Sequence, residues 1–176
     1  MKFYTSDLHL GHKNVLKFDN RPFKDLNEMH EAIIENWNSV ITENDDVYIL
    51  GDFAWHKEIG LETIKQLKGG KHLILGNHDR IDSEIKKEFL SIKSYDIVKD
   101  GDFKVVLSHF PLAHWVGERY GGVHLYGHVH TGEDFELLKE YKAKILKLGR
   151  LYRSYNVGCM LHNYTPKTLE QIMEEN

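Results

Sequence analysis

The sequence of 176 residues predicts an α/β fold built on a mixed β-sheet. Short apolar runs alternate with segments of helical period in the first half, and the second half is richer in strand-like runs. An Asp-Gly step at residues 100 and 101 separates two apolar runs and indicates a β-hairpin. Because no repeat, low-complexity tract or Pro/Ser-rich linker interrupts the chain, residues 1–176 are expected to form one domain.

Six apolar runs are expected to be strands and four segments are expected to be helices. The strands are Phe3–Thr5, Val47–Leu50, His72–Leu75, Lys104–Leu107, Val123–Tyr126 and Leu151–Val157. The first helix covers residues 26–41, where Leu26, Met29, Ile33, Trp37, Val40 and Ile41 share one face at helical spacing. Ile64 with Leu67, and Ile85 with Phe89, indicate two more helices. A C-terminal helix is expected to begin with Thr165 as N-cap and Pro166 in its first position.

The composition indicates a globular protein of 41% hydrophobic and 28% charged residues. A net charge of −4 argues against a broad electropositive nucleic-acid groove. One cysteine, Cys159, excludes an internal disulfide and a cysteine-based zinc site, and we expect it to be buried and inert. Since neither a signal-peptide layout nor an apolar run of membrane-spanning length is found, we expect a cytoplasmic protein that does not contact membranes.

Polar clusters follow five of the expected strands. They are Asp7 with His9, Gly51 with Asp52, the run Gly76, Asn77, His78 and Asp79, Ser108 with His109, and Gly127 with His128 and His130. Each cluster alone is typical of an ordinary turn, but five at successive strand ends are expected to converge, because ligands of open α/β sheets bind outside the carboxyl ends of the strands. Carboxylate, amide and imidazole groups without thiolate suit Mn²⁺, Fe or Zn²⁺. The three glycines are expected to make sharp turns that aim the next side chain.

In this order, the five clusters resemble the motifs of the calcineurin-like metallophosphoesterase superfamily over residues 5–130. The short chain and its opening "SDLHLGH" look like the small bacterial and phage phosphoesterases of that superfamily. The resemblance implies two mixed β-sheets packed as a sandwich flanked by helices. It also implies a site for two divalent metal ions, with Mn²⁺ expected and Fe, Zn²⁺ or Ni²⁺ as alternatives.

The resemblance also implies a role for each residue of the motifs. One ion takes Asp7, His9, Asp52 and His130, and the other takes Asp52, Asn77, His109 and His128, with Asp52 as the bridge. A metal-bridging hydroxide attacks the phosphorus, His78 approaches the scissile phosphate as general acid, and Asp79 orients it. Two ions, two aspartates and one hydroxide leave a charge of about +1, which attracts a phosphate oxyanion.

Substrate-binding candidates are Asn77, His12 and Arg21. Arginine offers a bidentate fork for phosphate. Simpler interpretations stay open: His12 as a polar residue at the start of a helix, and Arg21 as a surface arginine. Two interpretations of Arg80 stay open, a substrate contact and a helix cap. His30, His72, His124 and His162 carry no supporting pattern and are expected to be structural or solvated.

The expected activity is hydrolysis of small phosphodiesters, with nucleotides or cyclic nucleotides as candidate substrates. A phosphomonoester dianion usually calls for dedicated arginines beside the metals, and the motifs contain no such pair. The alternatives are a phosphomonoesterase, a non-catalytic binding scaffold on the same fold, and a nuclease of long DNA. The expected partner is a small phosphate ester, and no stable nucleic-acid complex is expected.

Overall fold

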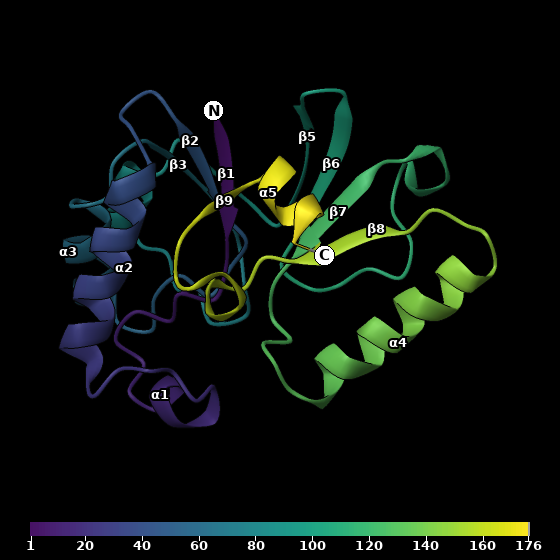
Figure 1. Cartoon of the computed structure of the whole chain (residues 1–176). Helices are drawn as coiled ribbons and strands as arrows, with labels where there is room; N and C mark the ends of the chain where they lie inside the picture. The colour runs from purple at the N-terminus through teal and green to yellow at the C-terminus, as the bar shows by residue number, and fades with distance from the viewer. Residues whose placement is uncertain (176) are drawn as a thin grey trace.

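Two mixed β-sheets pack face to face in the computed structural model, which describes residues 1–175 (Figure 1). The first sheet has the order β4-β3-β2-β1-β9, and the second has the order β5-β6-β7-β8. In the first sheet β1 to β4 run parallel and β9 is antiparallel to β1, while in the second β6 to β8 run parallel and β5 is antiparallel to β6. The predicted sandwich of two mixed sheets is therefore confirmed.

The strands are short, and each of the six predicted runs forms one. The first sheet contains β1 Lys2–Thr5, β2 Asp46–Ile49, β3 Gly70–Ile74, β4 Ser91–Lys93 and β9 Lys167–Thr168. The second contains β5 Tyr95–Asp100, β6 Phe103–Ser108, β7 Val123–Tyr126 and β8 Arg153–Asn156. The predicted hairpin is confirmed, because β5 pairs with β6 in antiparallel register up to Asp100 and Phe103.

The helices lie outside the sandwich or at its edge. They are α1 Val15–Phe18, α2 Leu26–Val40, α3 Lys57–Ile64, α4 Glu133–Lys147 and α5 Leu169–Glu174, with 3₁₀ turns η1 Ile85–Glu88, η2 Glu118–Tyr120 and η3 Cys159–His162. None of the helices in residues 1–175 has the length and apolarity required to cross a membrane.

Alternate residues along a strand belong to different apolar layers, as the two-residue period of a strand requires. Phe3 of β1 packs with Ile33 and Trp37 of α2, whereas its neighbour Tyr4 packs between the sheets. The layer between the sheets consists of Tyr4, Tyr48, Leu50, Ile74, Val105, Leu107, Val123, Leu125, Val157, Leu169 and Ile172. Trp115, Ile145 and Tyr152 cover Val106 on the outer face of the second sheet. This packing fixes both sheets and thereby the ends of their strands.

Two of the predicted helices form as proposed, but their bounds differ. The helix predicted over residues 26–41 ends at Val40, and it begins after Asp25, whose carboxylate accepts a hydrogen bond from the Glu28 backbone N–H at 3.0 Å. Helix α3 ends at Ile64, so Leu67 lies beyond it. The helix predicted around Ile85 and Phe89 is only the 3₁₀ turn η1.

The predicted start of the C-terminal helix at Thr165 and Pro166 is wrong. Thr168 is the N-cap of α5 and forms a capping box with Gln171. Residues 167 and 168 pair with β1 as β9, so the backbone stays extended there and the helix begins only after that pairing ends.

Helix α4 corresponds to no predicted element. Its sequence, EDFELLKEYKAKILK, has seven apolar and eight charged residues, and Ile145 is its only buried residue. Phe135, Leu138, Tyr141 and Ile145 recur at helical spacing, so the sequence contained the pattern of this helix and the prediction missed it.

Candidate metal centre

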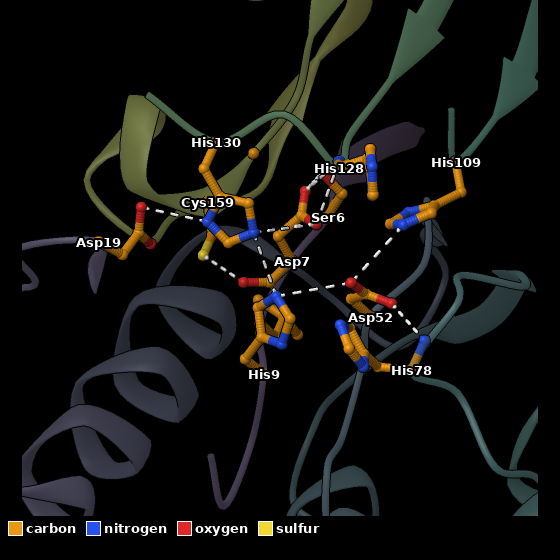
Figure 2. A network of polar contacts seen from close by, with 12 residues as sticks. Ser6, Asp7, His9, Asp19, Asp52, His78, His109, His128, His130 and Cys159 are labelled. Carbon is orange, nitrogen blue, oxygen red and sulfur yellow. Dashed lines mark hydrogen bonds and ion pairs between the residues drawn. The ribbon is translucent and has the colours of Figure 1, made fainter. Parts of the chain in front are cut away.

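The carboxyl ends of parallel strands from both sheets meet at one edge of the sandwich. Asp7 and His9 follow β1, and Asp52 follows β2. From the second sheet, His109 follows β6, and His128 and His130 follow β7. Figure 2 shows these side chains pointing toward one another from loops that are far apart in the sequence. The expected convergence of the polar clusters is therefore observed.

Two groups of side chains could each hold a metal ion. Asp7, His9 and His130 form one group, and Asp52, His109 and His128 form the other, with ligand atoms within 4.8 Å of one another in each group. Asp52 Oδ2 lies 3.6 Å from His9 Nε2 and 3.6 Å from His109 Nε2, which suits a carboxylate that bridges two ions. Asn77 Oδ1 lies 3.0 Å from His109 Nε2, so this amide completes the second group.

The orientation of His109 and the protonation of His9 suit a metal cation. The Leu50 carbonyl accepts a hydrogen bond from His109 Nδ1 at 2.8 Å, which leaves His109 Nε2 directed toward the oxygens of Asn77 and Asp52. Burial, assisted by the positive charges of His130 and Arg21, lowers the pKa of His9 to about 2, so its ring is neutral. Since acceptor atoms from several loops face a common centre, the residues present fit divalent metal ions.

Five of the seven predicted ligands have left-handed backbone conformations. The φ angles are 58° at Asp7, 51° at His9, 53° at Asp52, 73° at His128 and 46° at His130. Residues other than glycine rarely adopt φ in this range, and such conformations concentrate at functional sites. The chain therefore turns at the ligands themselves, immediately after each strand, and this directs their side chains into the site.

The glycines before the ligands are required by close approach more than by turning. Only Gly51 has a positive φ, of 89°. At Gly127 an added Cβ would lie 2.5 Å from Asp7 Oδ2 and 2.5 Å from Ser6 Oγ, and at Gly76 it would overlap the Asp52 carboxylate. The predicted turns are present, since the Asp79 N–H donates to the Gly76 carbonyl at 3.4 Å and the Val129 N–H donates to the Gly127 carbonyl at 2.9 Å. Glycine is required at these two positions because the carboxylates of the site occupy the space of a side chain.

Asp7 joins the two sheets at the site. Its carboxylate accepts hydrogen bonds from the Ser6 hydroxyl at 2.6 Å and from the His128 backbone N–H at 3.0 Å (Figure 2). Burial raises the pKa of this carboxyl, against the lowering effect of His130 and His109. A positive charge at the site would therefore stabilise the ionised form of Asp7.

Asp19 contacts the site through His130 and was not predicted from the sequence. Its Oδ1 lies 3.1 Å from His130 Nδ1, which leaves His130 Nε2 directed toward the centre, 3.2 Å from His9 Nε2. Burial alone would lower the pKa of His130, but the Asp19 and Asp7 carboxylates outweigh it and the pKa is raised. A carboxylate behind a histidine ligand orients the ring and increases its basicity. The feature of the sequence that could have indicated Asp19 is its position two residues before Arg21, which was a candidate site residue.

The structure contradicts the substrate-binding role predicted for Arg21. Its guanidinium is buried and donates to Asp19 Oδ2 at 2.9 Å, to the Leu8 carbonyl at 2.9 Å and to the Asp7 carbonyl at 2.7 Å. A guanidinium held in this way from the interior cannot reach a phosphate from solvent. Arg21 instead holds the loop that carries Asp7 and fixes Asp19 behind His130.

Asp79 also has a different role from the one predicted. Its carboxylate accepts hydrogen bonds from the backbone N–H groups of Gly76 at 2.8 Å, Asp52 at 3.0 Å and Phe53 at 2.8 Å. Among residues 1–175, the Asp79 carboxylate accepts no hydrogen bond from the His78 ring, so it does not orient that ring directly. Asp79 therefore ties the loop after β3 to the loop after β2. His78 is placed through its own backbone N–H, which donates to Asp52 Oδ1 at 3.0 Å.

His12 lies beside His78 at the edge of the site. Its ring stacks on Trp55 at a centroid distance of 4.2 Å, and its centroid lies 6.5 Å from that of His78. Burial, followed by the charge of His78, lowers the pKa of His12. This position is compatible with the predicted substrate contact, which stays a prediction.

The four histidines that were expected to be structural or solvated have hydrogen-bond partners, and Cys159 is buried. His124 lies 2.9 Å from the Ser108 hydroxyl and 3.0 Å from the Ser154 hydroxyl. His30, His72 and His162 contact Gly11, Ser91 and Glu175, respectively. Burial raises the pKa of the Cys159 thiol to about 12, so the thiolate is disfavoured, as expected for an inert cysteine.

The fold is a two-sheet sandwich, and carboxylate, amide and imidazole groups converge where the strands of both sheets end. These are the features of a metal-dependent phosphoesterase with a dinuclear divalent centre. The chain belongs to the calcineurin-like phosphoesterase family, whose model matches residues 3–148. That match contains all seven predicted ligands.

Similar proteins are known from archaea, phages and bacteria. The chain is 29% identical to the uncharacterized protein MJ1445 of Methanocaldococcus jannaschii over 175 residues, which cover 98% of this chain and 89% of that protein. It is 29% identical to the Gene 66 protein of Mycobacterium phage L5, with 73% of this chain and 77% of that protein covered. The crystal structure of the protein of unknown function AQ665 from Aquifex aeolicus superposes with a TM-score of 0.77 at 26% identity, covering 100% of this chain and 99% of the other.

We expect about two divalent ions per chain after reconstitution with Mn²⁺, because the ligands exceed what one tetrahedral site uses. Asp52→Asn removes charge from the bridge and is expected to weaken both sites. Elemental analysis and calorimetric titration measure the stoichiometry and affinity. Saturation of the unsubstituted protein at one ion per chain would contradict the dinuclear centre.

We expect Gly127→Ala to lower the free energy of unfolding by about 1–3 kcal/mol, because the new methyl group overlaps Asp7 and Ser6. It should also weaken metal binding, since Asp7 must move. Gly132→Ala is the matched control, because an added Cβ there meets nothing within 4 Å. Urea denaturation and metal titration of both variants test this, and equal behaviour of the two variants would refute the requirement for close approach.

Proposed function

We propose that this metal-dependent phosphoesterase hydrolyses small phosphodiesters, with Mn²⁺ as its metal. The observation that supports a diester is the interior position of Arg21. A phosphomonoester dianion carries one more negative charge than a diester, and arginines beside the metals usually neutralise it. Because Arg21 is held in the interior, it cannot neutralise the additional charge of a monoester at the metal centre.

The other arginines support the same proposal. Arg150 pairs with Glu118 at 2.6 Å, and Arg153 donates to the Gly121 carbonyl and lies over the Phe103 ring. Arg119 lies in η2, which precedes β7, whereas the metal centre follows that strand. Arg80, exposed and adjacent to Asp79, is then the one arginine of residues 1–175 that follows a strand into the site region. A single arginine and the metals suit a diester monoanion.

The chain's own residues have distinct roles in this proposal. When two divalent ions are bound, they lower the pKa of water and neutralise charge on the phosphoryl oxygens. The His78 ring, half-buried beside the His9 ring at a centroid distance of 5.7 Å, donates a proton to the leaving oxygen. Asn77 and His12 border the space for the phosphate. A binding scaffold without catalysis would not need an intact ligand set together with His78.

His78→Ala is expected to keep both metal ions and to lose about 100-fold or more of kcat on a diester with an alkoxide leaving group. The loss should shrink on a 4-nitrophenyl diester, because a good leaving group needs little protonation. His114→Ala is the control, since this exposed histidine pairs with Glu118 outside the metal centre. Loss of metal from the His78 variant, or full activity on the alkoxide substrate, would show that His78 is not the general acid.

Methyl 4-nitrophenyl phosphate is expected to have a higher kcat/KM than 4-nitrophenyl phosphate at saturating Mn²⁺. The two substrates share a leaving group and differ in the extra charge of the monoester. A preference for the monoester would overturn the proposal. It would also indicate that Arg80 neutralises the additional charge of the monoester, which Arg80→Ala would then test.

A further inference from the structure

A mainly apolar groove lies directly beside the second metal group. Its volume is about 500 Å³, and Phe110, Pro111, His128, Leu137, Leu138 and Tyr141 contribute to its lining. His128 belongs to both the groove and the metal group, so the two are continuous. The volume falls within the range of about 300–1,000 Å³ that is usual for small-molecule sites.

Phe110 forms the wall next to the metals. Its ring centroid lies 4.4 Å from that of His128 and 5.1 Å from that of His109, yet 49% of the residue is exposed. The Ser108 hydroxyl donates to the Phe110 carbonyl at 2.7 Å and fixes the backbone at this point. The Phe110 ring thus contacts both histidines, and about half of the residue stays accessible to a ligand.

Helix α4 forms the opposite wall. Leu137 is 61% exposed, and Leu138 and Tyr141 also line the groove. Asp134, in the first turn of α4, adds a carboxylate acceptor at the lining. A long alkyl chain would use the apolar walls but not this acceptor. A planar heterocycle with an amino group would use both.

We propose that this groove binds the nucleobase of a nucleotide substrate, with the base stacked on Phe110. The inference rests on the proposed function, because the base must be attached to a phosphate held at the metals. Base stacking on an aromatic side chain tolerates different bases, since every base has a π-face, and Asp134 favours bases with an amino group. Phe110 then determines specificity without taking part in the chemistry.

The test compares AMP with ribose 5-phosphate as ligands of the full chain loaded with Mn²⁺. Both ligands are monoesters with the same phosphate on the same sugar, so the unfavourable extra charge is equal in both and the comparison isolates the base. We expect AMP to bind about 10-fold or more tightly by calorimetry, and Phe110→Ala to reduce its affinity to that of ribose 5-phosphate. Phe110→Leu, which keeps apolar volume without a π-face, should lose most of the preference as well.

Phe18→Ala is the matched control. Phe18 is 55% exposed and lies 5.6 Å from the His130 ring, but it is not among the residues that line the groove. It should leave both affinities unchanged, and metal analysis should give the same content for all variants. Equal affinities of the unsubstituted protein for AMP and ribose 5-phosphate would overturn the inference. Tighter binding of hexyl phosphate than of AMP, lost in Phe110→Ala, would assign the groove to an alkyl chain and also overturn it.

Hydrolysis of methyl 4-nitrophenyl phosphate, measured on the same samples, separates this inference from the proposed function. Hydrolysis without a preference for AMP would refute the nucleobase groove alone. Binding of AMP through Phe110 without hydrolysis would refute the phosphodiesterase proposal and support the groove.

Discussion

Three buried or half-buried carboxylates hold together the loops on which the metal centre depends. Asp7 accepts from the His128 N–H and so joins the loop after β1 to the loop after β7 of the other sheet. Asp52 accepts from the His78 N–H, and Asp79 accepts from the N–H groups of Asp52, Phe53 and Gly76. Hydrogen bonds from backbone N–H groups to carboxylates are stronger than those between neutral groups. Asp7 and Asp52 therefore both connect loops and belong to the metal-binding groups, whereas Asp79 only connects loops.

This dual use of Asp7 and Asp52 explains the unusual backbone around them. A carboxylate can accept from a neighbouring loop and face a metal only if the loops approach closely, which excludes a side chain at Gly76 and Gly127. It also requires the chain to turn directly after the strand, and five ligand residues adopt a left-handed φ for this purpose. Such strain persists only where the surroundings fix it, and here the packed sandwich does so.

A second layer of contacts prepares the ligands electrostatically. The Leu50 carbonyl and the Asp19 carboxylate contact Nδ1 of His109 and His130, respectively, and each leaves Nε2 directed to the centre. Arg21 connects this layer to the first by bonding both Asp19 and the Asp7 carbonyl. Two exposed aromatic rings lie outside these contacts: Phe110 is next to the ligand His128, and Trp55 is next to His78. The site is therefore polar at its buried ligands and apolar at its exposed edge.

Six of the nine strands of residues 1–175, the hairpin and the group of converging polar residues could be predicted from the amino-acid sequence, because each of these features depends on neighbours in the chain. A ligand that directly follows an apolar strand is placed by that strand, and parallel strands bring their ends together. The roles of Arg21 and Asp79 become visible only in the folded chain, since their partners are backbone groups of other segments. The Asp7 carbonyl is 14 residues from Arg21, and the Asp52 N–H is 27 residues from Asp79. The same applies to α5, whose start is delayed by pairing with β1, and to the groove at α4, which exists only where that helix faces Phe110. Backbone groups carry no residue identity, so contacts made to them leave no pattern in the sequence.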